Sequence, residues 1–358
     1  MPEIKHRKTN RQPIGLISFN QKINMANMQA LVLVENEKIE LQSVPVPEPK
    51  AGEALIKIKA AALNHRDQWS RIGMYPGLKY PSILGSDGCG VVEKVHDDAD
   101  QTWVGKEVIM NPNVNWGDDP RFQSFNYSIL GMPTDGTLAE YVVIPTHRLH
   151  KKPAHLSAAQ AAALPLAALT AYRAVFTKGE AKPKHRVLVT GIGGGVSQFA
   201  FQFAKALGCK VFVTSGSDEK LEKMKATGAD GTANYKEDKW EKSLVKQAGG
   251  NFDVIIDSGG GKGFEALAKS LNLAGTLVVY GGTAGTKVTL QLPRFWFAQA
   301  NIKGSTMGND QEFEAMVQFV SDHKIIPMIS STRPLNEVVS AFDEMHEGKQ
   351  LGKLVIEV

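Results

Sequence analysis

Short apolar runs separated by turn residues fill the first part of the chain, from Met28 to about Pro153. Segments such as ALVLVE, EALIKIKAAAL and GCGVVEKV are rich in valine and isoleucine, and proline- and glycine-containing loops such as VPVPEPKAGE separate them. Because β-branched residues favour strands while proline and glycine interrupt them, this pattern predicts a mostly β domain over residues 28–155. We expect residues 1–27 to form an N-terminal extension. Their basic character would also suit a transit peptide, although they contain a single serine.

The pattern changes after the Ala/Leu-rich stretch LSAAQAAALPLAALTAYRAVF, which predicts a helix. HRVLVT predicts a strand, and the apolar residues of VSQFAFQFAKALG fall at helical spacing with one face toward a sheet. Further strand–helix units follow as far as GTLVVYGG. Such alternation is typical of a parallel sheet with helices on both faces. We therefore expect a nucleotide-binding α/β domain over residues 156–300, and a return of residues 301–358 to the first domain.

A glycine-rich turn joins the first strand of this second domain to its first helix, in the sequence VLVTGIGGGVSQ. A bound pyrophosphate needs bare backbone N–H groups at a helix N-terminus, where a Cβ atom would block its approach. Glycines placed between a strand and a helix therefore predict a dinucleotide site, while the alternative is a tight turn without a ligand. The third glycine of the fingerprint is replaced by Ser197. The residues expected to contact the cofactor here are Gly193, Gly194, Gly195 and Val196.

The end of the next strand decides between the two nicotinamide dinucleotides. Sites specific for NAD place Asp or Glu there to bind the ribose 2′-hydroxyl, but this strand ends in FVTSGSDEK. Ser215, Ser217 and Lys220 would accept a 2′-phosphate, whereas Asp218 suits the first turn of a helix. The sequence therefore favours NADPH over NADH, with a solvated helix face as the alternative role of Lys220.

Overall composition gives no sign of a macromolecular partner. The chain has 41 basic and 37 acidic residues, a net charge of +4, and no apolar run near the roughly 18 residues that span a bilayer. Its two cysteines, Cys89 and Cys209, are too few for a disulfide scaffold or for the usual zinc spacings. We expect buried, reduced thiols in a cytoplasmic protein that binds a small-molecule substrate, with no nucleic acid and no membrane.

The glycine turn and the stretch NHRDQWSRIGMYP resemble those of the medium-chain dehydrogenase/reductase superfamily. Within this superfamily, the chain is most similar to the zinc-independent, quinone-oxidoreductase-like branch. The resemblance covers Met28 to Val358 and implies a Rossmann domain joined to a mostly β, GroES-like catalytic domain. In the alcohol dehydrogenases of this superfamily three residues bind catalytic zinc, and their places here are Asn64, Ser86 and Leu166. None of the three is Cys or His, so we expect no metal.

The same resemblance suggests roles for individual residues. It places Asn64 and Asp67 in the cleft near the nicotinamide and gives Tyr75 a hydrogen bond to the substrate carbonyl. Alternatively, Tyr75 is only an aromatic lip, and Asn64 and Asp67 only tie their loop together. Further cofactor contacts are expected from Tyr235, at the adenosine phosphate, and from Ser258, Gly281, Gly282, Thr283 and Met307.

These observations lead to the hypothesis of an NADPH-dependent oxidoreductase that delivers a hydride to a quinone or to an activated alkene or carbonyl. The alternatives are an enoyl-thioester reductase, a zinc-type alcohol dehydrogenase, and an NADPH-binding sensor or structural protein without turnover. Family members are commonly dimers, so a homodimer is expected, and LQLPRFWFAQANIKGS could supply an apolar edge for pairing. The aromatic residues Phe295, Trp296 and Phe297 could equally line the cleft or lie in the core.

Overall fold

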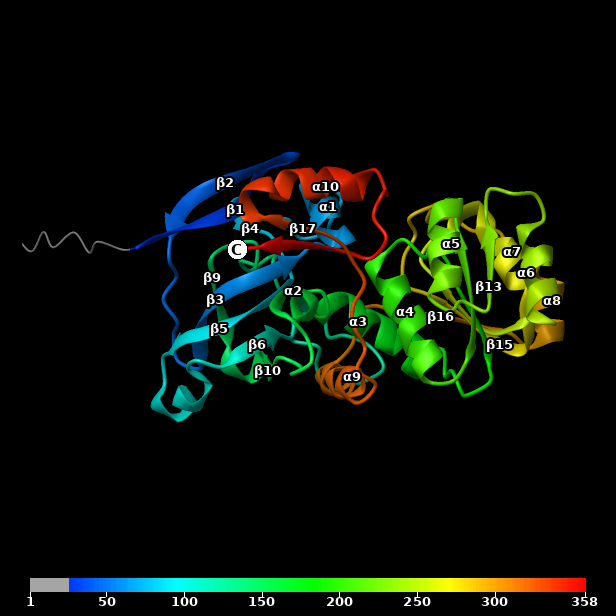
Figure 1. The fold of residues 1–358 in the computed structure, drawn as a ribbon, viewed down its shortest axis with the longest axis horizontal. Helices are drawn as coiled ribbons and strands as arrows, with labels where there is room; N and C mark the ends of the chain where they lie inside the picture. Colours follow the sequence, from blue (N-terminus) through cyan, green and yellow to red (C-terminus); the bar gives the residue numbers. More distant parts are fainter. Residues whose placement is uncertain (1–25) are drawn as a thin grey trace, which may run out of the picture.

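The structure, a computed structural model, describes residues 26–358. Two domains, each built around its own sheet, lie side by side (Figure 1), which confirms the expected α/β fold with a mostly β, GroES-like domain and a Rossmann-like domain. The first 25 residues of the expected N-terminal extension lie outside the described part of the chain. No helix within residues 26–358 is long and apolar enough to cross a membrane.

The first domain, called the catalytic domain here after the role that the resemblance implies, is organised around a sheet in the order β10-β6-β5-β3-β18-β17, with β9 paired to β3. Most residues of β3 are buried, and Ile56 packs into a core that also includes Leu33 and Phe342. The strands are β3 (Glu53–Ala62), β5 (Asp87–Val95), β6 (Glu107–Met110), β9 (Tyr141–Pro145), β10 (Leu149–Lys151), β17 (Ile329–Pro334) and β18 (Lys353–Glu357).

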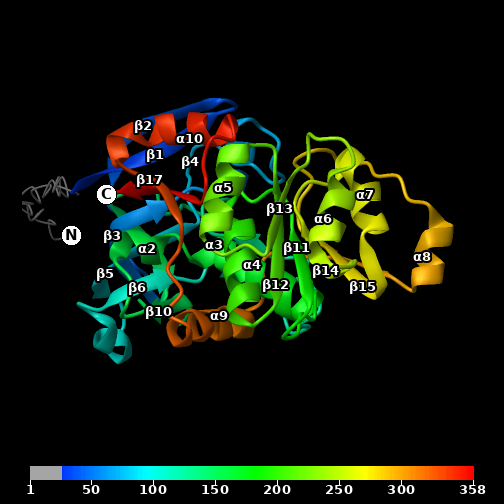
Figure 2. The ribbon, with the colours of Figure 1, turned by 45° about the vertical axis from the view of Figure 1, so that its right-hand side comes forward.

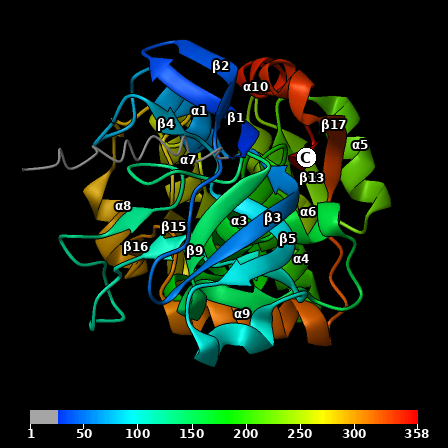
Figure 3. The same cartoon turned by 90° about the vertical axis from the view of Figure 1, so that its left-hand side faces the viewer.

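Smaller elements complete this domain. A second sheet has the order β2-β1-β4, and a two-stranded ribbon, β7-β8, follows the loop after β6. Their bounds are β1 (Asn27–Glu35), β2 (Lys38–Pro45), β4 (Ser82–Ile83), β7 (Asn113–Val114) and β8 (Ser128–Ile129). The helices are α1 (His65–Arg71), α2 (Ala158–Ala162) and α10 (Val338–His346), with short 3-10 turns at Asp98–Trp103, Thr146–Arg148 and Leu335–Glu337. As Figure 3 shows, α10 lies beside β1 and β2 on one face of the domain.

The nucleotide-binding domain contains six parallel strands in the order β13-β12-β11-β14-β15-β16. This is the strand order of the doubly wound dinucleotide-binding fold. The strands are β11 (Arg186–Val189), β12 (Lys210–Ser215), β13 (Gly231–Asn234), β14 (Phe252–Asp257), β15 (Leu271–Val279) and β16 (Asn301–Gly304). The helices are α4 (Gly195–Ala206), α5 (Asp218–Ala226), α6 (Trp240–Ala248), α7 (Phe264–Lys269) and α8 (Leu292–Ala298), with a 3-10 turn at Gly261–Gly263.

The chain crosses between the domains near α3 (Pro165–Tyr172), which continues as a π-helix over Arg173–Lys178. Both α3 and α9 (Asp310–Asp322) lie between the two sheets in Figure 1. The domain boundaries differ slightly from the expected ones, because β16 still pairs with β15 in the nucleotide sheet and α2 still packs on β3 and β5. After α9 the chain returns to the catalytic domain, where Val355 of β18 pairs with Ala62 of β3.

Candidate functional site

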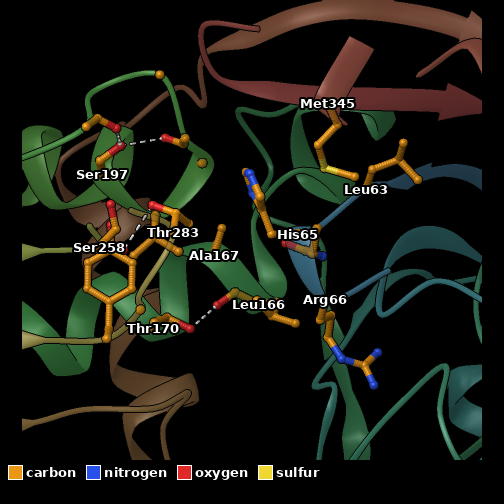
Figure 4. Close-up of a pocket in the computed structure, with 18 of the residues that line it drawn as sticks. Leu63, His65, Arg66, Leu166, Ala167, Thr170, Ser197, Ser258, Thr283 and Met345 are labelled. Carbon is orange, nitrogen blue, oxygen red and sulfur yellow. Dashed lines mark hydrogen bonds between the residues drawn. The ribbon is translucent and has the colours of Figure 1, made fainter. Parts of the chain in front are cut away.

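A cleft of about 720 Å³ lies between the two domains, at the carboxyl ends of the nucleotide-domain strands. This is the edge at which doubly wound sheets bind their ligands. Residues of the two domains face each other across it in Figure 4, with Ser197, Ser258 and Thr283 on one side and Leu63 and Met345 on the other. Among residues 26–358, no aspartate or glutamate lines the cleft, whereas Arg66, Lys220 and Lys353 do. Lys353 is paired with Asp87, so it is Lys220, at one end of the cleft, that suits a ligand carrying negative charge.

The glycine turn forms the floor of the cleft, and α4 begins at Gly195 with Gly194 as its N-cap. A Cβ atom on Gly195 would lie 2.6 Å from Cδ of Lys353, and one on Gly193 would lie 3.0 Å from Nζ of Lys220. Ser197, in the third glycine place, is buried, and its Oγ lies 2.9 Å from Gly191 O and 2.8 Å from Gly194 O. The serine thus stabilises the turn from within, and the bare backbone at the start of α4 fits a pyrophosphate.

The end of β12 shapes one end of the cleft. Ser215, Lys220 and Tyr235 line it, and Nζ of Lys220 donates to Gly348 O at 2.7 Å, in the loop between α10 and β18. Burial lowers the pKa of Lys220. Asp218 does not line the cleft, and its Oδ1 accepts a hydrogen bond from Asn234 Nδ2 at 2.8 Å.

Ser217 is the one residue of the expected cofactor set that the structure does not bring to the cleft wall. It is the N-cap of α5, and its Oγ accepts the backbone N–H of Lys220 at 3.4 Å. A capping serine satisfies a free N–H of the first helical turn. Its side chain is therefore committed to the helix.

The loops after β14 and β15 form the opposite end. Ser258, Gly281, Gly282, Thr283 and Met307 all line the cleft, as expected for a nicotinamide pocket. The Thr283 backbone N–H and Oγ1 both donate to Ser258 O, at 3.1 and 3.2 Å. Met307 is buried with a left-handed φ of +43°, a conformation that costs energy in a residue with a side chain and is common at ligand sites.

Tyr280 also lines this end of the cleft, although no sequence motif singled it out. Burial raises its pKa well above the ordinary range. The only signal was its position, directly before the two glycines that follow β15. It adds a phenol to the nucleotide-domain side of the cleft, beside those of Tyr75 and Tyr235 elsewhere in the lining.

On the catalytic side, α1 presents His65 to the cleft, and its imidazole points toward the cleft interior in Figure 4. His65 is exposed to solvent in the cleft, but the cleft walls displace part of the water around its imidazole ring. This desolvation, followed by the positive charge of Lys353, lowers the pKa of His65. The side chain is therefore mostly neutral in the free protein near pH 7.

Tyr75 is half-buried at the cleft, with the Arg66 guanidinium 4.6 Å above its ring. Within the described part of the chain its hydroxyl has no hydrogen-bond partner, so it is free to bind a ligand. Asp67 is different. It is fully buried and outside the cleft, its Oδ2 accepts the Asn64 backbone N–H at 2.8 Å, and burial raises its pKa. The structure places Asp67 beneath the start of α1, where it caps the helix.

The three places that hold catalytic zinc in the superfamily's alcohol dehydrogenases carry no matching ligand set. Ser86 donates to Leu130 O at 2.7 Å and accepts from Arg66 Nη1 at 2.5 Å, while Leu166 contributes an apolar side chain. No group of three or more His, Cys, Asp or Glu side chains within residues 26–358 could hold a metal ion. Catalytic zinc requires three such ligands, so these residues do not fit it.

Both cysteines are free and buried, as expected. Burial raises the pKa of Cys89 to about 12 and that of Cys209 to about 11. Thiols with raised pKa values are poor nucleophiles at neutral pH. Both pack in the same hydrophobic core cluster.

Sequence reasoning missed Lys353, the first residue of β18, which reaches the cleft floor with a side chain only 3% exposed. Its Nζ donates to Leu63 O and Asn64 Oδ1, both at 2.7 Å, and to Asp87 Oδ2 at 2.9 Å. Asn64 Nδ2 donates to the same Asp87 oxygen at 2.9 Å. The one available signal was a lysine at the start of the otherwise apolar run KLVIE.

Comparison with known proteins agrees with this architecture. Residues 50–154 match the alcohol dehydrogenase GroES-like domain family, and residues 195–322 match the zinc-binding dehydrogenase family. The zinc-type alcohol dehydrogenase-like protein YogA of Leptosphaeria maculans is 39% identical over 344 residues, which cover 89% of this chain and 94% of the relative.

Two solved structures are also similar. A crystal structure of an NAD-dependent alcohol dehydrogenase has a TM-score of 0.86 at 36% identity, covering 92% of this chain and all of the other. The 2-octenoyl-CoA carboxylase reductase CinF, solved with NADP and 2-octenoyl-CoA, has a TM-score of 0.82 at 25% identity, covering 92% and 87%. With its two domains, its glycine turn and these matches, the chain belongs to the medium-chain dehydrogenase/reductase superfamily of oxidoreductases.

Proposed function

We propose that this protein is an NADPH-dependent, zinc-independent reductase of quinones or of alkenes activated by a carbonyl group. The observation that carries the proposal is the composition of the cleft at the three zinc-ligand places. Asn64 and Lys353 form a hydrogen-bonded network there, Ser86 is bonded to Arg66, and Leu166 is apolar. The chemistry of the site must then rely on hydrogen-bond donors and fixed charge.

The choice of NADPH rests on the residues around the end of β12. Lys220, Ser215 and Tyr235 line that end, and Asp218 is bonded to Asn234. A carboxylate in the cleft would repel a 2′-phosphate, whereas an ammonium and hydroxyl groups bind one. Gly193 to Gly195 would hold the pyrophosphate, and the loops at Ser258, Thr283 and Met307 would hold the nicotinamide. When bound, NADPH supplies the hydride.

The residues of the chain then have to orient the acceptor and stabilise charge on its oxygen. Reduction of a quinone or of a conjugated alkene builds negative charge on a carbonyl oxygen, and preorganised donors stabilise such charge strongly in a site sheltered from water. The Tyr75 hydroxyl and the Asn64 amide are donors on the catalytic wall of the cleft. Tyr75 can also hold the proton that the product needs, because its hydroxyl is committed to no other residue within the described part of the chain.

An enoyl-thioester reductase is the second candidate, since the similar structure of CinF contains NADP and 2-octenoyl-CoA. The same donors would serve a thioester carbonyl. A zinc-type alcohol dehydrogenase is suggested by the name of the Leptosphaeria relative, but the donor set at Asn64, Ser86 and Leu166 argues against it. A sensor that binds NADPH without turnover is the fourth candidate.

One set of assays separates these candidates. Purified protein is tested with NADPH and NADH against quinones, enones and enoyl-CoA thioesters, and with NADP⁺ and NAD⁺ against primary and secondary alcohols, while its zinc content is measured by elemental analysis. We expect NADPH oxidation with quinones or enones and less than about 0.1 zinc per chain. Turnover only with thioesters supports the second candidate, and stoichiometric zinc with alcohol oxidation would overturn the proposal. Tight NADPH binding without turnover of any substrate would support the sensor.

We also propose a homodimer formed through the outer edge of the nucleotide domain. None of the residues of α8 is buried, and Leu292, Trp296 and Phe297 are 60, 57 and 79% exposed. Figure 2 shows α8 at the end of the nucleotide domain farthest from the catalytic domain, and neighbouring β16 is the edge strand of its sheet. Exposed aromatic side chains beside an open strand edge favour pairing with a second copy.

A further inference from the structure

The metal-free wall of the cleft contains a buried ammonium group for which the proposed function has so far given no role. We infer that Lys353 and Asp87 are positioning residues that fix the Asn64 amide, so that one of its N–H groups is a permanent donor to the carbonyl oxygen of the substrate. This inference rests on the proposed function. It names the donor that would bind the substrate oxygen here, where catalytic zinc binds it in the superfamily's alcohol dehydrogenases. The Lys353–Asp87–Asn64 network is the unit to be tested.

The ammonium of Lys353 is fully committed to its own wall. An ammonium has three N–H donors, and the three acceptors around Nζ are Leu63 O, Asn64 Oδ1 and Asp87 Oδ2, at 2.7, 2.7 and 2.9 Å. The lysine and aspartate side chains are 3 and 0% exposed. Lys353 therefore has no donor left for a substrate, and it acts through its position and charge.

This arrangement determines the orientation of the Asn64 amide. An ammonium only donates, so the amide oxygen must face Lys353, and the amide nitrogen then faces Asp87 Oδ2 at 2.9 Å. A primary amide has two N–H groups, and the second has no partner within residues 26–358. Since Asn64 lines the cleft, this remaining N–H is the donor that the wall offers to a ligand.

The charges of the network strengthen that donor. Lys353 and Asp87 compensate each other, and the second oxygen of Asp87 accepts the Leu166 backbone N–H at 2.7 Å, which holds the carboxylate in place. An ammonium on the amide oxygen draws electron density from the amide nitrogen, and such chains of hydrogen bonds strengthen one another in a buried environment. The Asn64 N–H is thus a better donor than a free amide, at a place where no metal is held.

The same lysine connects the donor to the cofactor floor. Its stem lies against Gly195, where a Cβ atom would come within 2.6 Å of Cδ, and the Gly352 backbone N–H donates to Gly193 O at 3.1 Å. Lys353 of β18 therefore contacts both the glycine turn and Asn64, so it fixes the position of the substrate oxygen relative to the cofactor site. Hydride transfer depends on such fixed placement of the two reactants.

The first test compares Lys353→Met, Asn64→Ala and the double variant in steady-state quinone reduction. Removal of one preorganised oxyanion donor typically costs about 10²-fold in rate, so each single variant should lose about that factor in kcat with an NADPH Kd within threefold of wild type. Because both residues act through one N–H, the double variant should be at most threefold slower than the slower single variant. Lys152→Met is the matched control. It removes another lysine of the catalytic domain, 11% exposed and bonded to Leu156 O at 2.6 Å, and should retain wild-type rates.

A second readout needs no turnover. 4-Nitrophenol resembles a reduced quinone, and its absorbance distinguishes phenol from phenolate. In the wild-type protein with NADP⁺ bound, the cleft should bind the phenolate at least tenfold more tightly than the phenol. Asn64→Ala and Lys353→Met should lose this preference, while Lys152→Met keeps it.

The outcomes separate the two claims. A wild-type protein that turns over no quinone, enone or thioester overturns the proposed function and this inference with it. If the wild-type protein turns over a substrate, three results overturn the inference alone. These are full rates in both single variants, multiplicative losses in the double variant, and the absence of a phenolate preference in the wild-type protein. If Lys353→Met fails to bind NADPH, the Asn64→Ala variant tests the inference. An unchanged phenolate preference in Asn64→Ala would show that Asn64 is not the donor.

Discussion

Replacing Lys220 by methionine tests whether the end of the cleft beside β12 selects NADPH. Methionine keeps an unbranched stem on α5 and removes the ammonium, so the packing of the helix should persist. In the free protein Nζ of Lys220 donates to Gly348 O at 2.7 Å and lies near Gly193. When NADPH binds, the Lys220 ammonium would donate to the charged 2′-phosphate in place of this neutral carbonyl.

The size of the effect follows from that exchange. Hydrogen bonds to charged groups contribute about 1.5–3 kcal/mol. The lower end applies here, because Lys220 is only half-buried and already has an acceptor before the cofactor binds. A loss of about 1.5 kcal/mol corresponds to an increase of roughly tenfold in the Kd for NADPH. NADH has no 2′-phosphate, and its Kd should stay within about twofold.

The assay is a fluorescence titration of both cofactors against wild type, Lys220→Met and Lys223→Met. Lys223 lies one turn further along α5, is exposed and pairs with Glu219 at 2.7 Å, so its variant controls for lost surface charge. We expect only Lys220→Met to change the ratio of the two Kd values. An unchanged ratio in that variant, or an equal change in Lys223→Met, would refute the assignment of the 2′-phosphate to Lys220.

Three further predictions test the rest of the site. Ser215→Asp places a carboxylate at the end of β12 and should shift the preference toward NADH by at least tenfold in Kd ratio; retention of the NADPH preference would count against this position. The pKa of His65 is lowered in the free protein, and the negative charge of NADPH bound in the same cleft would raise it, so NADPH binding should take up a proton and affinity should increase as the pH falls from 8 to 6. Calorimetry in two buffers measures the proton uptake, which His65→Asn should abolish; equal uptake in that variant would assign it to another group. Phe297→Asp should give a monomer by light scattering with a wild-type Kd for NADPH, whereas an unchanged dimer would place the interface elsewhere.

The nucleotide half of the site could be predicted because its geometry follows from chain order. All parallel strands end at one edge of the sheet, so residues directly after a strand meet there. Ser215 ends β12, Ser258 follows β14 and Gly281 follows β15, and all three line the cleft. The same reasoning wrongly placed Ser217 in the cleft wall. Ser217 lies two residues past its strand, and its side chain caps α5 instead of reaching the cleft.

The catalytic half depends on contacts that no local pattern encodes. Lys353 and Asn64 are 289 positions apart, and they meet because Val355 pairs with Ala62 in an antiparallel register between β18 and β3. Sequence reasoning also kept Asp67 near the nicotinamide, because spacing alone does not show that its side chain turns back to cap α1. Register and side-chain direction across distant strands are properties of the folded sheet, and they decide which polar residues face the cleft.

If the Asn64 amide, held by the Lys353 ammonium, serves in place of a metal ion as we propose, this limits the chemistry that the cleft can support. A zinc ion lowers the pKa of a bound oxygen by many units, which assists the removal of a proton from a simple alcohol. Lys353 carries a single charge that Asp87 balances, and it reaches the ligand only through the Asn64 amide. Such a donor is best suited to an oxygen whose negative charge is already shared with a conjugated ring or alkene. Under the proposed function, we therefore expect this wall to favour reduction of conjugated carbonyl compounds over oxidation of alcohols.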